Sequence, residues 1–65
     1  MKLTLAAARE NAGYMLKDAS RLIGVTPSAL SNYESGLRKI PAIRLQVLLE
    51  KYNTKFEDII LISKR

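Results

Sequence analysis

A run of short polar side chains between Thr26 and Gly36 is the part of this sequence best suited to recognise another molecule. If residues 27–35 form a helix, one of its faces carries Pro27, Ser28, Ser31, Asn32 and Ser35. Solvated helix faces more often carry Glu, Lys, Arg or Gln, which form helices better than Ser and Asn. Short hydroxyl and amide side chains suit a helix that enters a DNA groove, where Asn can pair with adenine and Ser with several bases. The alternative is a weak helix that packing alone stabilises, as in αα-hairpins without a binding role.

The charge of the chain also favours a polyanionic partner. The 65 residues include 11 Lys and Arg against 6 Asp and Glu, a net charge of +5, although many small solvated domains carry as much. Residues 17–44 hold five basic and two acidic residues, a net charge of +3. Composition selects Lys17, Arg21 and Arg44 as charges that could face phosphates. For each of them, a role as a solvated surface charge is the alternative.

Several other function classes are poorly supported. The chain has no His and no Cys, which removes the commonest metal ligand, the commonest general base and thiolate chemistry. Its six carboxylates show no metal-like spacing, and a domain of this length buries only about 60% of its unfolded surface, too little for a deep cleft. We therefore expect no enzyme activity, no cofactor, no metal and no small-molecule ligand.

We also expect a cytoplasmic protein without membrane contact. No apolar run approaches the roughly 18 residues of a membrane helix, and no helix is strongly basic and amphipathic. The N-terminal stretch MKLTLAAARENAG is interrupted by Arg9 and Glu10 too early for a secretory signal.

The elements that would position the polar face are short helices separated by regular breaks. These breaks are Gly13, Gly24, Gly36 and Asn53, while Pro27 and Pro41 stand where helices could begin. The predicted helices cover about residues 4–12, 16–23, 27–35 and 41–52, and a capping box at residues 54–57 predicts a fifth. The β-rich stretch 59–62 is short and has no evident partner, so we expect no strand. The predicted fold class is all-α, with five helices in a single domain of residues 1–65.

The helix at residues 27–35 has clear predicted ends. Thr26 suits the N-cap and Pro27 the first helical position, while Gly36 can take the positive φ of a helix stop. Glu34 is then oddly placed, because the C-terminal turn of a helix carries partial negative charge. A buried carboxylate at this position would need a positively charged partner.

Residues 9–36 resemble the lambda-repressor-like helix-turn-helix family, the XRE-like family of Cro and phage repressors. The resemblance rests on Arg9, Gly13-Tyr14, the turn Gly24-Val25-Thr26 and the exit Tyr33-Glu34-Ser35-Gly36, and it continues loosely through Pro41 and residues 52–59. Three departures stand out. Met15 and Leu16 replace the usual polar cap and Gln, Ser20 replaces the usual Ala, and the stretch 41–48 is one residue short.

The resemblance implies a compact five-helix DNA-binding domain whose helix-turn-helix spans about residues 16–35. Helix 27–35 would lie in the major groove. Base-reading positions match Pro27, Ser28 and Asn32, with Ser31 beside them. Backbone-contact positions match Thr26, Ser35 and the loop with Arg38 and Lys39, to which composition adds Lys17, Arg21 and Arg44. Pro27 needs no functional explanation at the first helical position, and facing a base it offers only apolar contact.

The resemblance also supplies a partner for Glu34, because family members pair this Glu with an Arg at the position of Arg9. Family members commonly bind palindromic double-stranded DNA as dimers. The surplus apolar residues that could form a homodimer contact are Ile40, Ile43, Val47, Leu61 and Ile62; completion of a small core is the alternative. These features predict a sequence-specific regulator of prokaryotic or phage type, a repressor acting by operator occupancy. The alternative is a protein-interaction module of the same fold, antitoxin-like or phage-encoded.

Overall fold

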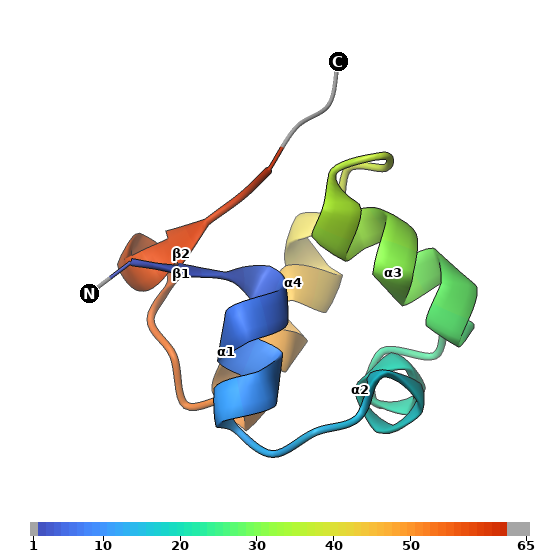
Figure 1. Ribbon diagram of the computed structural model, residues 1–65, viewed down its shortest axis with the longest axis horizontal. Coiled ribbons are helices and arrows are strands. Elements are labelled where there is room, and N and C mark those ends of the chain that lie inside the picture. The colour runs from blue at the N-terminus through green and yellow to red at the C-terminus, as the bar shows by residue number, and fades with distance from the viewer. Residues whose placement is uncertain (1, 63–65) are drawn as a thin grey trace.

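Four α-helices, one short 3-10 helix and two short strands make up residues 2–62, the part of the chain that the computed structural model describes (Figure 1). The α-helices are α1 (Leu5–Asn11), α2 (Leu16–Leu22), α3 (Pro27–Ser35) and α4 (Ala42–Lys51). The 3-10 helix η1 is Phe56–Asp58, and the strands are β1 (Leu3–Thr4) and β2 (Ile59–Ile60). The molecule is therefore mostly helical, with four α-helices rather than the five expected.

The predicted fifth helix is wrong because its capping box does not form. Thr54 does not cap a helix; its Oγ1 donates a hydrogen bond to the carbonyl oxygen of Tyr52 at 3.1 Å. The 3-10 turn η1 begins after Lys55, without a side-chain cap. Phe56, the first residue of this turn, is 66% exposed and does not anchor it to the core. A single 3-10 turn fits because the chain must become extended again at Ile59, where the backbone has φ −101° and ψ 135°.

The expectation of no strand is also wrong. β1 and β2 form a two-stranded parallel sheet in which Leu3 lies opposite Ile59 and Thr4 opposite Ile60. The partner of the β-rich stretch thus lies at the other end of the described chain, where local periodicity gives no sign of it. Lys2 adds a contact between the same two segments, because its Nζ donates to the carbonyl oxygen of Glu57 at 2.6 Å.

The hydrophobic core lies where the four helices meet. Its buried members are Leu5, Ala8, Ala19, Leu30, Ile40, Leu45, Leu48, Leu49 and Tyr52. Ser20 is the one buried polar residue among the described ones, and its Oγ donates to the carbonyl oxygen of Lys17 at 2.8 Å. This bond satisfies the hydroxyl inside the core, so the small side chain lets α3 pack closely on α2.

The turn between α2 and α3 depends on Gly24 and on the amide of Val25. Gly24 has φ 68°, in the left-handed region that favours glycine. The amide of Val25 donates to the carbonyl oxygen of Ser20 at 3.0 Å, which closes the turn back onto α2. These two features fix the direction in which α3 leaves the turn.

The predicted ends of α3 are confirmed. Thr26 Oγ1 accepts a hydrogen bond from the amide of Ala29 at 3.1 Å, Pro27 is the first helical residue and Gly36 ends the helix with φ 86°. Thr4 caps α1 in the same way, with its Oγ1 accepting from the amide of Ala7 at 3.1 Å. The fourth helix differs slightly from its expected bounds, because Pro41 is its N-cap and not its first residue.

Candidate nucleic-acid interface

The face of α3 that points away from the core is accessible along most of its length. Exposed on it are Thr26, Pro27, Ser28 and Ser31, while Asn32 and Ser35 are half-buried. Leu30 lies on the opposite face and is fully buried, so packing against the core sets the rotation of the helix about its axis. Within residues 2–62, the side chains of Ser28, Ser31 and Asn32 make no hydrogen bond. Their donors and acceptors are therefore available to a ligand.

Thr26 and Ser35 mark the two ends of this face, and each has one bond within the protein. The Thr26 hydroxyl accepts from Ala29, which leaves its own hydrogen available for an acceptor such as a phosphate oxygen. The Ser35 hydroxyl donates to the carbonyl oxygen of Asn32 at 3.3 Å and keeps its lone pairs free to accept.

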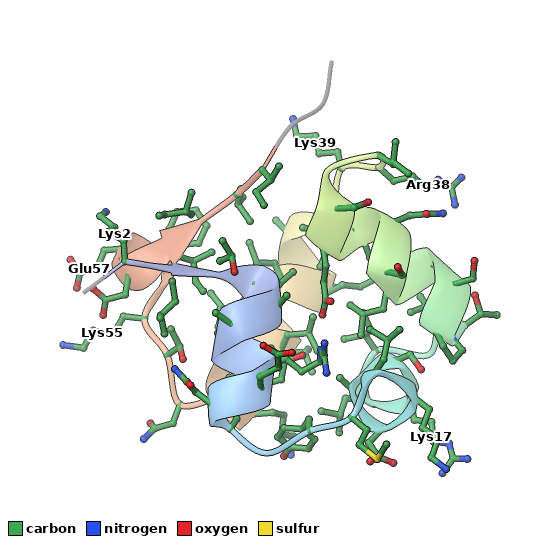
Figure 2. The ribbon with its side chains drawn as sticks, in the orientation of Figure 1. Lys2, Lys17, Arg38, Lys39, Lys55 and Glu57 are labelled. Carbon is green, nitrogen blue, oxygen red and sulfur yellow. The ribbon has the colours of Figure 1, made fainter. Side chains whose placement is uncertain are left out.

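Exposed basic side chains lie near both ends of the α3 face. Figure 2 shows Lys17 beside α2 and Arg38 near the C-terminal end of α3. Arg21 and Lys39 are also exposed. In the part of the chain described, none of these four forms an ion pair or side-chain hydrogen bond. The result is a neutral hydrogen-bonding strip with positive charge at both ends, a distribution that suits base edges between two phosphate backbones.

Arg44 is placed differently from the other predicted phosphate-side residues. It is half-buried, and its Nη1 donates to the hydroxyl oxygen of Tyr33 at 3.1 Å. This bond links α4 to the C-terminal half of α3. Sequence reasoning missed this link, because the two residues face each other only once the helices have packed.

Glu34 lies behind the outer face, paired with Arg9. The Nε of Arg9 lies 2.8 Å from Glu34 Oε2, and its Nη2 lies 3.5 Å from Oε1, so the guanidinium meets the carboxylate in a side-on arrangement. Arg9 Nη1 also donates to the carbonyl oxygen of Tyr14 at 2.9 Å. The side chains are only 13% and 9% exposed, so the carboxylate faces α1 and leaves the outer face of α3 neutral.

Tyr52 lies next to this ion pair, and its hydroxyl was not foreseen from the sequence. Its ring packs on Tyr14 with centroids 5.6 Å apart and planes at 46°. Its buried hydroxyl has no hydrogen-bond partner within residues 2–62. Burial, with a further contribution from Glu34, raises the pKa of Tyr52 well above its ordinary value.

The apolar residues expected at a dimer contact do not all lie on the surface. Ile43 is 76% exposed on α4, and Leu61 and Ile62 are also exposed, while Val47 is half-buried. Ile40 belongs to the core with 8% exposure, so its side chain is not available to a second copy. The accessible candidates fall into two groups, one on α4 and one following β2.

Comparison with known proteins gives one match. A helix-turn-helix family model matches residues 5–59, which include all four α-helices and the ion pair between α1 and α3. No curated protein and no solved structure matches the chain. Among the helices of residues 2–62, none has the length and apolar character needed to cross a membrane.

Proposed function

This chain belongs to the lambda-repressor-like helix-turn-helix family of DNA-binding regulators, and on that premise we propose that it represses transcription by occupying a specific double-stranded operator. The observation that carries the proposal is the outer face of α3. It presents unbonded hydroxyl and amide groups, is held in orientation by buried Leu30, and is flanked by exposed basic residues. Such a face fits the major groove of DNA.

In this proposal, the outer face of α3 reads the bases, through residues between Pro27 and Asn32. Asn32 has both a donor and an acceptor on its amide, the combination that pairs with the edge of adenine. Ser28 and Ser31 can donate to or accept from several bases. Pro27 offers only an apolar surface, suited to the methyl group of thymine.

The surrounding groups bind the two phosphate backbones. Thr26, with the N-terminal amides of α3, takes a phosphate on one side, together with Lys17 and Arg21. Ser35, Arg38 and Lys39 take the backbone on the other side. Arg44 supports this second group through its bond to Tyr33 and need not reach the DNA itself.

Two copies would bind a palindrome with half-sites about one helical turn apart. Ile43 with Val47, or Leu61 with Ile62, supplies the apolar surface for a symmetric contact between the copies. The dimer would then cover the operator and exclude polymerase. Sedimentation should detect a dimer at high concentration or on DNA, and a monomer under both conditions would contradict this part of the proposal.

The deciding experiment is selection of bound sites from random DNA, followed by binding measurements with variants. The wild type should select a palindrome. Asn32→Ala and Ser28→Ala should relax the preference at defined positions, by about 1–3 kcal/mol for a lost bidentate contact, while the domain stays folded. Gln46→Ala is the matched control, because Gln46 is an exposed amide on α4. Equal affinity for all sequences would contradict a specific regulator.

A further inference from the structure

Residues 61–62 lie across the C-terminal end of α3, at Gly36. Although Gly36 ends a helix next to solvent-exposed residues, it is buried. A Cβ at this position would lie 2.6 Å from the carbonyl oxygen of Ile62, 2.8 Å from its carbonyl carbon and 3.1 Å from its Cγ2. Gly36 is therefore required twice, once for its φ of 86° and once for the approach of this segment.

The loop that follows Gly36 carries the basic residues on this side of α3. Leu37, Arg38 and Lys39 are all exposed, and Leu37 is 63% exposed. One backbone hydrogen bond ties the loop to α3, from the amide of Arg38 to the carbonyl oxygen of Asn32 at 3.2 Å. The same carbonyl accepts the Ser35 hydroxyl, so the loop is anchored at the residue expected to read a base.

The C-terminal segment and this loop line the same hollow. The hollow has a volume of about 320 Å³, and its lining includes Leu37, Arg38 and Lys39 of the loop together with Leu61 and Ile62. Figure 2 shows Lys39 and Arg38 leaving the loop in different directions. The loop therefore has one backbone hydrogen bond to α3 and shares a hollow with residues 61–62.

The start of the segment is itself fixed. Because Leu3 pairs with Ile59 and Thr4 with Ile60, the parallel sheet sets where residues 61–62 leave β2 and how far they reach. Strand register thus determines which residue arrives at Gly36, and a slip of one residue would reverse which side chains face inward. The N-terminal strand, the sheet and the C-terminal segment form a continuous connection to the basic loop.

We propose that residues 61–62 position the basic loop for the DNA backbone, with Ile62 as the positioning residue. The inference rests on the proposed DNA binding. A loop with a single hydrogen bond to its helix samples many arrangements, and fixing it on binding reduces affinity. Contact of Ile62 with Gly36, where the loop begins, restricts the loop beforehand, so that Arg38 and Lys39 are held near the phosphates that they neutralise.

The main test compares two glycines with the same backbone strain. Gly36→Ala introduces a Cβ into the Ile62 contact, whereas Gly13→Ala introduces one at φ 84° with no atom within 4 Å. Both substitutions strain the backbone, but only the first displaces the segment. The dependence of log affinity on log salt should weaken by about 1–2 for Gly36→Ala, the loss of one or two phosphate contacts, and stay unchanged for Gly13→Ala. An unchanged salt dependence in folded Gly36→Ala would overturn the inference.

A second variant leaves Gly36 and its helix end intact. Ile62→Ala removes the Cγ2 that approaches Gly36, and Ile60→Ala is its control, since Ile60 is 46% exposed and Ile62 44%. Ile62→Ala should accelerate hydrogen exchange of the Arg38 amide severalfold more than Ile60→Ala, with or without DNA. Equal exchange in the two variants would overturn the positioning role.

A third test removes the two charges of the loop and asks whether Gly36→Ala still weakens the salt dependence of binding. In an Arg38→Ala/Lys39→Ala background, Gly36→Ala should produce no further loss of salt dependence, because the charges that it displaces are already absent. An undiminished loss would show that the segment acts elsewhere and would overturn the inference. A wild type without salt-dependent DNA binding would instead contradict the proposed function, and hydrogen exchange at Arg38 would still decide the positioning role.

Discussion

The two ends of α3 are held in different ways. At the N-terminal end, residues close in sequence hold the helix. Thr26 caps it, Pro27 occupies its first position with a favourable φ, and the Val25 amide bonds to the carbonyl oxygen of Ser20. At the C-terminal end, residues distant in sequence hold the helix. Arg9 from α1 pairs with Glu34, Arg44 from α4 bonds to Tyr33, and Ile62 lies against Gly36.

This difference separates two roles within one helix. The end expected to meet base edges is fixed by contacts that form as soon as the turn and helix form, so changes elsewhere in the domain affect it little. The end expected to meet a phosphate backbone is correct only when α1, α4 and the C-terminal segment are all in place. Breaking the contacts at the C-terminal end should therefore cost the domain more stability than breaking those at the N-terminal end.

The largest effect should come from breaking the ion pair at the C-terminal end. Glu34→Gln leaves Arg9 with a neutral partner at a site where both side chains are mostly buried, with 13% and 9% exposed. We expect the free energy of unfolding to fall by about 2–4 kcal/mol, slightly less than for a fully buried pair, because some solvent reaches these groups. Urea denaturation measures the loss, and site selection should give the same operator. Unchanged stability with an altered operator would place Glu34 at the DNA.

A substitution next to this pair should raise the free energy of unfolding, by less than Glu34→Gln lowers it. Tyr52→Phe removes a buried hydroxyl that has no partner within residues 2–62 while keeping the ring against Tyr14. The variant should be more stable by about 1 kcal/mol at neutral pH, because the cost of burying an unsatisfied group is removed. Tyr33→Phe is the contrast, since the hydroxyl of Tyr33 accepts from Arg44 and its removal should destabilise. A less stable Tyr52→Phe would mean that the hydroxyl is hydrogen-bonded.

The same substitution predicts a pH dependence. Burial raises the pKa of Tyr52 in the folded state above the value of about 10 for an unfolded chain. Above pH 10 the unfolded chain loses this proton first, so the wild type loses stability as the pH rises. The stability gap between Tyr52→Phe and the wild type should be constant below pH 9 and widen from pH 10 upward. A gap that stays constant to pH 11 would contradict burial of the hydroxyl.

At the N-terminal end of α3, the cap can be removed alone. Thr26→Ala should cost about 1 kcal/mol of stability, because the Ala29 amide loses its acceptor. DNA affinity should fall as well, through the lost phosphate contact, with the base preference unchanged. Thr54→Ala is the matched control, since the Thr54 hydroxyl bonds only to a nearby carbonyl and caps no helix. An equal cost in the two variants would show that the cap contributes little.

The features that could be predicted from the sequence are those that depend on neighbouring residues, and the features that were missed depend on distant ones. The N-terminal end and the exit of α3 depend on Thr26, Pro27 and Gly36, whose preferences are local, and the structure agrees with all three. The capping-box motif at residues 54–57 was misleading, because pairing of β2 with β1 overrides it. That pairing joins opposite ends of the described chain, and no periodicity within either segment indicates it.

The candidate site divides in a similar way. The neutral outer face of α3 could be predicted from Ser28, Ser31 and Asn32, because helical spacing places these residues on one side of the helix. The partner of Glu34 came only from the family resemblance, since nothing within either helix points to Arg9. The bond between Arg44 and Tyr33 and the contact of Ile62 with Gly36 depend on how separate elements pack, and residue types alone do not show either of them.

The smallest expected effect concerns the helix that precedes the turn. α2 starts after Met15, which makes no side-chain cap bond and is 64% exposed, so its side chain packs on little. Met15→Ser should therefore stabilise the domain by about 0.5–1 kcal/mol, by giving the first turn of α2 the acceptor that Thr26 already gives α3. Met15→Ala is the control, because it removes the same side chain without adding an acceptor. If the two variants were equally stable, the start of α2 would be fixed by packing on its neighbours α3 and α4, without a contribution from local capping.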